Sequence, residues 1–182
     1  MSITAEHAQQ VYNEAECLFT AQQVQAAMDV MAQDISRAVG GRDPLILCVM
    51  TGGIIAVGQL LPRLNFPLQL DYIHATRYSG QTQGGELRWI AKPRASLTGR
   101  VVMVIDDILD EGITLAAIVQ NCKDEGASEV YSAALVNKRH ERKSDFRTDF
   151  VGLEVDDRYV FGFGMDYKGY LRNAQGIFAV KE

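Results

Sequence analysis

The chain has 182 residues, 47% of them hydrophobic and 23% charged, which is typical of a soluble globular protein built around one core. Its net charge of -5 argues against a nucleic-acid-binding protein, because a phosphate backbone requires a basic surface. We find neither an apolar run long enough to span a membrane nor a signal-peptide start, so we expect a cytoplasmic protein without a membrane partner. The three cysteines are far apart, which argues against a disulfide framework and a structural zinc site.

The first half of the chain predicts helices alternating with strands. Apolar residues at three-and-four spacing predict an amphipathic helix over 20–39, with Thr20 as its N-cap and Gly40 at its end. The unbroken apolar run over 44–50 predicts a strand that is buried on both faces. The remaining elements of this half are a helix over 54–64, a strand over 68–75, an exposed mobile loop over 79–85 and a strand over 86–91 that pairs antiparallel with the preceding one.

The second half continues the alternation. A buried strand is predicted over 101–105, a helix over 113–125 that Gly126 ends, and a further buried strand over 130–136. Short strands follow over 150–153, 159–163 and 177–180.

This order of elements predicts an α/β protein whose central parallel sheet is flanked by helices. We find no internal repeat and no linker, so we expect residues 1–182 to form a single domain. Ligands of such sheets bind at the carboxyl ends of the strands, which places the expected chemistry just after Met50, Ile105, Val136 and Phe163.

One cluster of basic residues stands out in this acidic chain. Its composition alone favours a solvated loop, because acidic residues lie within it and just after it. The cluster comprises Lys138, Arg139, His140, Arg142 and Lys143.

The segment 101–115, with the sequence VVMVIDDILDEGITL, carries most of the functional information. A buried strand is predicted to end in Asp106 and Asp107, which we call the acid pair. The following residues, 110–114, form what we call the phosphate loop, which leads through Gly112 into a helix. Amide groups at a helix N-terminus favour phosphate, and glycine allows the backbone to approach it closely.

The acid pair would repel a phosphate, so its natural partners are ribose hydroxyls or a hydrated magnesium ion. Each acid alone would fit a solvated turn. The ordered combination of an acid pair and a phosphate loop favours a site for a sugar phosphate instead.

This segment resembles the phosphoribosyl pyrophosphate signature of type I phosphoribosyltransferases, and the downstream residues resemble their hypoxanthine-guanine branch. The resemblance extends from about Leu45 to Val180. It implies the type I phosphoribosyltransferase fold, with a small hood formed by the N-terminal and C-terminal segments and a mobile lid over about 77–86. It also implies transfer of a phosphoribosyl group to hypoxanthine or guanine with Mg²⁺, in a homodimer or homotetramer.

The resemblance assigns roles to residues of the central segment. The acid pair would hold the ribose hydroxyls and Mg²⁺, and Asp110 would be the catalytic acid or base near N7 of the purine. Glu111 stands where relatives carry threonine or serine, so we expect its side chain to point away from the phosphate. The residues implied to bind the 5′-phosphate and ribose are Asp106, Asp107, Asp110, Glu111, Gly112, Ile113 and Thr114.

The remaining roles fall on four further segments. Lys138 would donate to O6 of the base and so favour a 6-oxopurine over a 6-aminopurine, because lysine is only a donor. Tyr159 would stack on the purine. The resemblance also implies purine contacts from Val160, Met165 and Asp166, and a second magnesium contact from Asp166. It implies pyrophosphate contacts from Arg172 and from Thr51 and Gly52, the last two in a loop with a cis peptide bond. It further implies that Arg77 and Tyr78 belong to the lid.

Two alternatives remain at this point. A non-enzymatic nucleotide-binding regulator on the same fold would be expected to carry a basic face, which the acidic composition disfavours. A receiver-like signalling domain would carry its acid pair after the first strand, whereas here the pair follows a middle strand.

Overall fold

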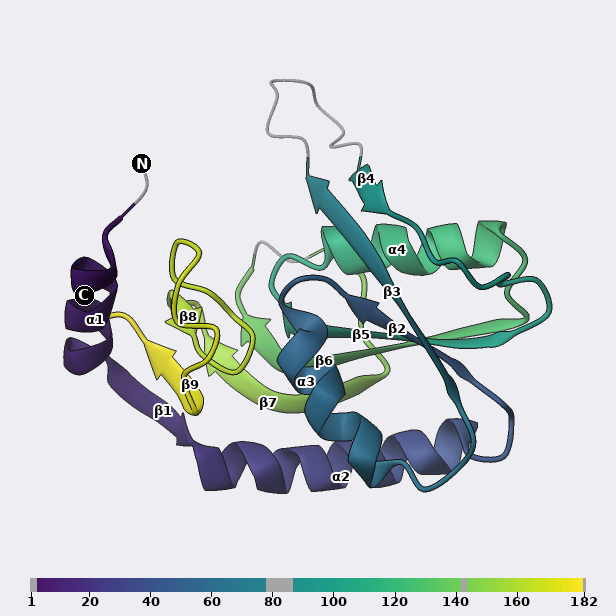
Figure 1. The fold of residues 1–182 in the computed structure, drawn as a ribbon, viewed down its shortest axis with the longest axis horizontal. Coiled ribbons are helices and arrows are strands. Elements are labelled where there is room, and N and C mark those ends of the chain that lie inside the picture. The colour runs from purple at the N-terminus through teal and green to yellow at the C-terminus, as the bar shows by residue number, and fades with distance from the viewer. Residues whose placement is uncertain (1–2, 78–86, 142–143, 182) are drawn as a thin grey trace.

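The structure is a computed structural model that describes residues 3–77, 87–141 and 144–181. Two sheets organise it, as Figure 1 shows. The large sheet has, in spatial order, β4 (Leu87–Ala91), β3 (Gln69–Arg77), β2 (Leu45–Val49), β5 (Val101–Leu109), β6 (Glu129–Arg139) and β7 (Phe150–Asp156). The small sheet has the order β1 (Glu16–Thr20), β9 (Gly176–Ala179) and β8 (Val160–Phe161).

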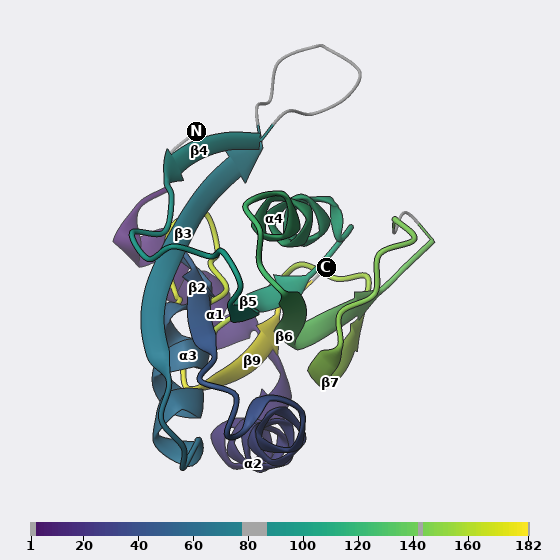
Figure 2. The same ribbon diagram turned by 90° about the vertical axis from the view of Figure 1, so that its right-hand side faces the viewer.

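The large sheet is parallel from β3 to β7, and β4 is antiparallel to β3. Helices α2 (Ala21–Val39) and α3 (Gly53–Leu60) pack on one face, and α4 (Ile113–Asp124) packs on the other, as Figure 2 shows. The predicted parallel sheet flanked by helices is therefore confirmed. The antiparallel strand pair predicted on either side of residues 79–85 is also confirmed, while that loop lies outside the described residues.

Helix α2 begins and ends as its sequence predicts. The Thr20 hydroxyl accepts from the Gln23 backbone N–H, and the Gln23 side chain accepts from the Thr20 N–H at 2.9 Å, which is a complete capping box. Gly40 is the C-cap. The apolar stripe packs against the large sheet with Val24, Met28, Met31, Ile35 and Val39 all buried.

Strand β5 is longer than predicted. It continues through the acid pair to Leu109 instead of ending at Ile105. The reason lies in its two neighbours: β2 pairs with it only as far as Ile105, whereas β6 stays paired until Leu109 lies opposite Asn137. The acid pair is thus held in extended backbone at a point where one neighbouring strand has already ended.

Other predicted boundaries also differ from the structure: β6 and β7 run on to Arg139 and Asp156 instead of ending near Val136 and Leu153. Helix α3 ends at Leu60 and continues only as the 3₁₀ turn η1 (Leu61–Arg63), because Pro62 lacks the N–H that an α-helix requires. The strand predicted over 159–163 is only Val160–Phe161, since Gly162 and Phe163 take positive φ angles of 98° and 52° and turn the chain.

The small sheet joins the N-terminal strand β1 with the C-terminal strands β8 and β9, which are the segments assigned above to the hood. Strand β1 and helix α1 (Ala5–Glu14) were not among the predicted elements. Tyr12 of α1 packs edge-on against Phe161 and Phe178, and these two rings stack on each other at 5.7 Å. Within the described ranges no helix is long and apolar enough to cross a membrane.

Candidate active site

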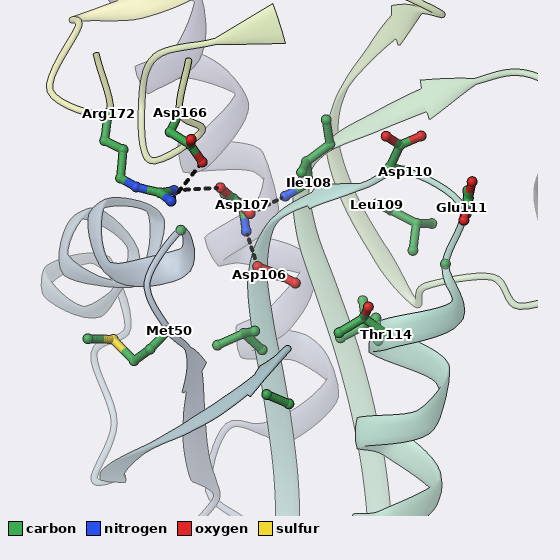
Figure 3. Close-up of a pocket in the computed structure, with 15 residues that line it drawn as sticks. Met50, Asp106, Asp107, Ile108, Leu109, Asp110, Glu111, Thr114, Asp166 and Arg172 are labelled. Atoms are coloured by element: carbon green, nitrogen blue, oxygen red, sulfur yellow. Dashed lines mark hydrogen bonds and ion pairs between the residues drawn. The ribbon is translucent and has the colours of Figure 1, made fainter. Parts of the chain in front are cut away.

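A cavity of about 320 Å³ lies beyond the carboxyl ends of β2 and β5, the edge of the sheet at which a ligand site is expected. Figure 3 shows its residues. They come from β2 and the loop after it, from β3 and β5, from the phosphate loop and the first turn of α4, and from the loop before β9. The residues that line the cavity are Val49, Met50, Gly52, Ala75, Asp106, Asp107, Ile108, Leu109, Asp110, Glu111, Gly112, Thr114, Leu115, Asp166 and Arg172.

The acid pair lies at the centre of the view in Figure 3. The Asp106 carboxylate accepts from the backbone N–H of Asp107 at 2.8 Å, and the Asp107 carboxylate accepts from the N–H of Ile108 at 2.9 Å. Burial, and after it the charge of Asp107, raise the pKa of Asp106 well above its ordinary value. Burial likewise raises the pKa of Asp107. Two carboxylates side by side, one buried and one partly buried, favour a bound cation.

The backbone approaches Asp107 closely from two other loops. A Cβ added to Gly52 would lie 2.1 Å from Asp107 Oδ2, and one added to Gly164 would lie 2.3 Å from the Gly52 carbonyl oxygen. The peptide bond between Met50 and Thr51 is cis, as the resemblance implied. The loop after β2 and the loop after β8 therefore meet at this carboxylate, and glycine is the residue that leaves room for the contact.

Arg172 joins the acid pair to Asp166. Its guanidinium lies 2.7 Å from Asp166 Oδ1 and 4.0 Å from Asp107 Oδ2, and it donates to the Gly164 carbonyl oxygen at 2.6 Å. Figure 3 draws both acid contacts. A guanidinium held between two carboxylates presents its remaining donors in a fixed direction.

The phosphate loop follows at the outer end of β5. Gly112 has a φ of 83°, a left-handed conformation that suits glycine, and α4 begins at the next residue. The first turn of α4 carries no acidic residue, and within the described part of the chain no side chain caps its N-terminus. Its amide groups and the Thr114 hydroxyl therefore suit an anion.

Asp110, at the start of the phosphate loop, is bound by two side chains. Lys138 Nζ lies 3.0 Å from Oδ2, and His140 Nε2 lies 2.6 Å from Oδ1. Burial alone would raise the pKa of Asp110, but the hydrogen bonds from Lys138 and His140 outweigh it, and the pKa is lowered. Asp110 is accordingly an ionised carboxylate that accepts one hydrogen bond from Lys138 and one from His140.

The structure brings together many of the residues expected at the site, but not all of them. The acid pair, Asp110, Glu111, Gly112, Thr114, Gly52, Asp166 and Arg172 line one cavity. Thr51 and Ile113 are exposed beside it and do not line it.

The expected purine-binding residues do not line this cavity, Asp166 excepted, although Lys138 contacts Asp110 at its edge. Tyr159 is half exposed and contacts the Tyr167 ring edge-on at 5.4 Å. Val160 and Met165 are buried side chains. For the lid, Arg77 ends β3, and Tyr78 lies outside the described residues. The roles of all these residues stay predictions.

His140 is the site residue that sequence reasoning missed. The solvated-loop interpretation is wrong for Lys138 and His140, whose side chains are 12% and 3% exposed. Arg139 is solvated, with 59% of its side chain exposed, but it lies in strand β6 rather than in a loop. A signal was present: side chains alternate along a strand, so residues 138 and 140 share a side of β6 and its extension while Arg139 faces the other. Arg142 and Lys143 lie outside the described residues.

Comparison with known proteins places this arrangement in a family. The phosphoribosyl transferase domain family matches residues 15–168. The hypoxanthine-guanine-xanthine phosphoribosyltransferase of Tritrichomonas foetus is 29% identical over 166 residues, which cover 91% of this chain and 91% of that protein. The hypoxanthine-guanine phosphoribosyltransferase of Sus scrofa is 30% identical over 162 residues, which cover 84% of this chain and 74% of that one.

A solved structure agrees with these sequence matches. The hypoxanthine phosphoribosyltransferase of Staphylococcus aureus superposes with a TM-score of 0.88 at 26% identity, covering 93% of this chain and 94% of that one. The region matched by the family contains the acid pair, the phosphate loop and the Asp110–Lys138 contact. Fold, site and sequence thus agree, and the chain belongs to the phosphoribosyltransferase family, in its hypoxanthine-guanine branch.

Proposed function

We propose that this protein transfers the 5-phosphoribosyl group of phosphoribosyl pyrophosphate to hypoxanthine or guanine, forming IMP or GMP and releasing pyrophosphate. The observation that carries the proposal is that the acid pair and the N-terminus of α4 line a single cavity. A ribose 5-phosphate needs acceptors for its hydroxyls at one end and amide donors at the other. The names of the similar proteins support the same reaction.

The sugar phosphate binds, in this proposal, along the phosphate loop. The 5′-phosphate lies against the amides of residues 111–114 and the Thr114 hydroxyl, where the α4 dipole favours negative charge. The ribose hydroxyls donate to Asp106 and Asp107. The leaving pyrophosphate lies toward Arg172 and the loop containing Thr51 and Gly52, and Arg172 neutralises part of the charge that develops on it.

The residues at the cavity suit a magnesium ion. Within the described ranges no cluster of three or more acidic, histidine or cysteine side chains forms a complete metal cage. Mg²⁺ commonly binds through one or two carboxylates together with substrate phosphates, and the acid pair provides two carboxylates whose raised pKa values a cation would lower. When bound here, with Asp166 as a further candidate contact, magnesium would neutralise negative charge on the pyrophosphate.

The purine binds, in this proposal, between Lys138 and the loop after β8. Lys138 donates to O6, and Asp110 accepts a hydrogen bond or a proton at N7. Tyr159 stacks on the ring, Val160 contributes its backbone groups, and Met165 lines the base pocket. Since a donor at position 6 suits an oxo group, adenine would be a poor substrate.

Three further expectations complete the proposal. Arg77 and Tyr78 belong to a lid over about 77–86 that would keep water from the reacting ribose. The chain acts as a single domain and assembles as a homodimer or homotetramer. It acts in the cytoplasm, an environment in which its three free cysteines would stay reduced.

Steady-state assays with purified protein, Mg²⁺, phosphoribosyl pyrophosphate and each of hypoxanthine, guanine, xanthine and adenine test the proposal. We expect IMP or GMP from the 6-oxopurines and little or no AMP. The Asp110→Ala variant should lose about 100-fold or more in kcat while it still folds cooperatively, because acid–base groups commonly contribute that much. The Lys138→Ala variant should raise the KM for the base by about tenfold or more, the loss of one charged hydrogen bond.

A wild-type protein that binds neither phosphoribosyl pyrophosphate nor GMP in the presence of magnesium would refute the proposal. Unchanged turnover in Asp110→Ala would remove that residue from any catalytic role. An unaltered base KM in Lys138→Ala would show that the O6 contact is wrong.

A further inference from the structure

The chain after the middle of β6 holds the phosphate loop at three points, of which the proposed function uses one. Lys138 Nζ contacts Asp110 Oδ2 at 3.0 Å. His140 Nε2 contacts Asp110 Oδ1 at 2.6 Å. The backbone N–H of Ser144 donates to the Glu111 carbonyl oxygen at 2.9 Å. The loop that precedes α4 is therefore fixed from outside as well as by its own glycine.

The contact of His140 with Asp110 follows from the direction of the strand. Lys138 and His140 are two residues apart and point to the side of the phosphate loop, while Arg139 points away and bonds Asp156 of β7 at 2.7 Å. His140 is almost fully buried, with 3% of its side chain exposed, whereas 48% of the Asp110 side chain is exposed. A buried ring thus holds a carboxylate that itself remains accessible from the cavity.

Two separate donors constrain a carboxylate more than one does. If only Lys138 donated to Asp110, at Oδ2, the carboxylate could rotate about its Cβ–Cγ bond and the flexible lysine side chain could follow it. A buried imidazole on Oδ1 removes that freedom, because the ring cannot follow the rotation. The ammonium of Lys138 has three hydrogens, so it can keep one on Asp110 and still donate to a ligand.

We propose that His140 is a positioning residue, which holds the Asp110 carboxylate so that Asp110 and Lys138 together present one acceptor and one donor to a 6-oxopurine at a fixed separation. The inference deepens the proposed function and rests on it. His140 need not touch either substrate, because it acts through Asp110. The lowered pKa of Asp110 is consistent with a carboxylate that keeps both donors.

The role makes a specific kinetic prediction. Loss of the imidazole should affect the steps that involve the base, because Asp110 faces the purine in the proposed function. Binding of phosphoribosyl pyrophosphate should change little, since the acid pair is held by the backbone N–H groups of Asp107 and Ile108, whereas His140 is bound to Asp110. A merely structural role would lower all parameters together with stability.

The test compares variants of similar size that differ in the donor. His140→Met fills the site without a donor and should lower kcat/KM for hypoxanthine by about 10- to 100-fold, as misplaced catalytic groups do, with the KM for phosphoribosyl pyrophosphate within about twofold of wild type. His140→Gln can place an amide N–H near Oδ1 and should stay within about threefold. Arg139→Met, the adjacent residue on the opposite side, is the matched control and should match wild type.

A double-mutant cycle separates positioning from packing. If His140 acts through Asp110, His140→Met should lower the remaining activity of Asp110→Asn by less than about twofold, because the group it positions is already gone. Should His140→Met fail to fold, His140→Asn replaces it, since the shorter amide does not reach Asp110 and should be impaired where His140→Gln is not.

Each outcome decides the inference. Equal losses in the Met (or Asn) and Gln variants, full additivity with Asp110→Asn, or a His140→Met variant as active as wild type would overturn the positioning role. A wild-type protein without activity toward any 6-oxopurine would overturn the proposed function and this inference together. An active wild type with an unaffected His140→Met variant would overturn this inference alone.

Discussion

The close approach of Gly52 to Asp107 predicts a large effect from a single added methyl group. Gly52 has φ -60° and ψ -46°, a conformation that alanine adopts without strain. Its added Cβ would nonetheless lie 2.1 Å from Oδ2, 2.4 Å from Cγ and 2.6 Å from Oδ1 of Asp107. The Gly52→Ala variant therefore forces the Asp107 carboxylate to move, and any loss has a steric rather than a backbone origin.

The cost can be estimated from what the carboxylate gives up. Its hydrogen bond from the Ile108 N–H is charge-assisted and is worth about 1.5–3 kcal/mol. A side chain driven away from its preferred rotamer costs about 0.5–1.5 kcal/mol more. Gly52 is the N-cap of α3, a position where alanine brings no gain over glycine, so nothing offsets these losses. The net loss in the free energy of unfolding is therefore about 2–4.5 kcal/mol.

Gly58 provides the matched control in the same helix. A Cβ added there meets no atom within 4 Å, so Gly58→Ala should stabilise the protein by about 0.5–1 kcal/mol. Urea unfolding of the ligand-free proteins measures both changes. Calorimetry with Mg²⁺ and phosphoribosyl pyrophosphate should show binding lost in Gly52→Ala and retained in Gly58→Ala. If Gly52→Ala were as stable as Gly58→Ala and bound the ligand normally, the tight contact at Asp107 would be wrong.

Two other predictions concern titration. Because the folded state raises the pKa of Asp106 above its ordinary value of 3.8, that group contributes stability below the unfolded pKa, and the contribution is lost as pH rises through the folded pKa. In urea unfolding, Asp106→Asn should therefore stabilise the ligand-free protein at pH 7 more than at pH 4. The same variant should lose the binding of phosphoribosyl pyrophosphate with magnesium. A variant that is less stable than wild type at pH 7 would contradict the burial argument. Burial raises the pKa of Cys48 and of Cys122 to about 11, whereas Cys17 is exposed. At pH 8 only about one in a thousand of such buried thiols is ionised. A disulfide reagent should therefore modify one thiol, that of Cys17, rapidly in the native protein and all three thiols in urea. The fast phase should be absent in Cys17→Ser.

The large sheet and its helices could be predicted because their signals are local. Apolar periodicity predicted α2 with its cap at Thr20, and unbroken apolar runs predicted the centres of β2, β5 and β6. Strand ends were less accurate, because the length of β5 depends on where β2 and β6 stop pairing with it. That depends on neighbours far along the chain and leaves no mark in residues 101–109 themselves.

Of the small sheet, strands β8 and β9 were predicted, whereas β1 escaped prediction for a related reason. Strand β1 is five residues long and only partly buried, so it has neither a strict alternation nor a continuous apolar run. It is stabilised by pairing with β9, at the other end of the chain. Strand β8 is shorter than its apolar sequence suggests, because the turn at Gly162 and Phe163 ends it.

By itself, the sequence determined which chemical groups are available and in what local order: an acid pair, a phosphate loop with its glycine, and a lysine at the end of a later strand. Only the tertiary structure decided which of them meet. The contacts of Gly52 and Gly164 with Asp107, and of His140 with Asp110, join segments that are distant in the chain. Local propensity specifies the elements, but the packing of strands and loops against one another specifies the distances between side chains, and the chemistry of the site depends on those distances.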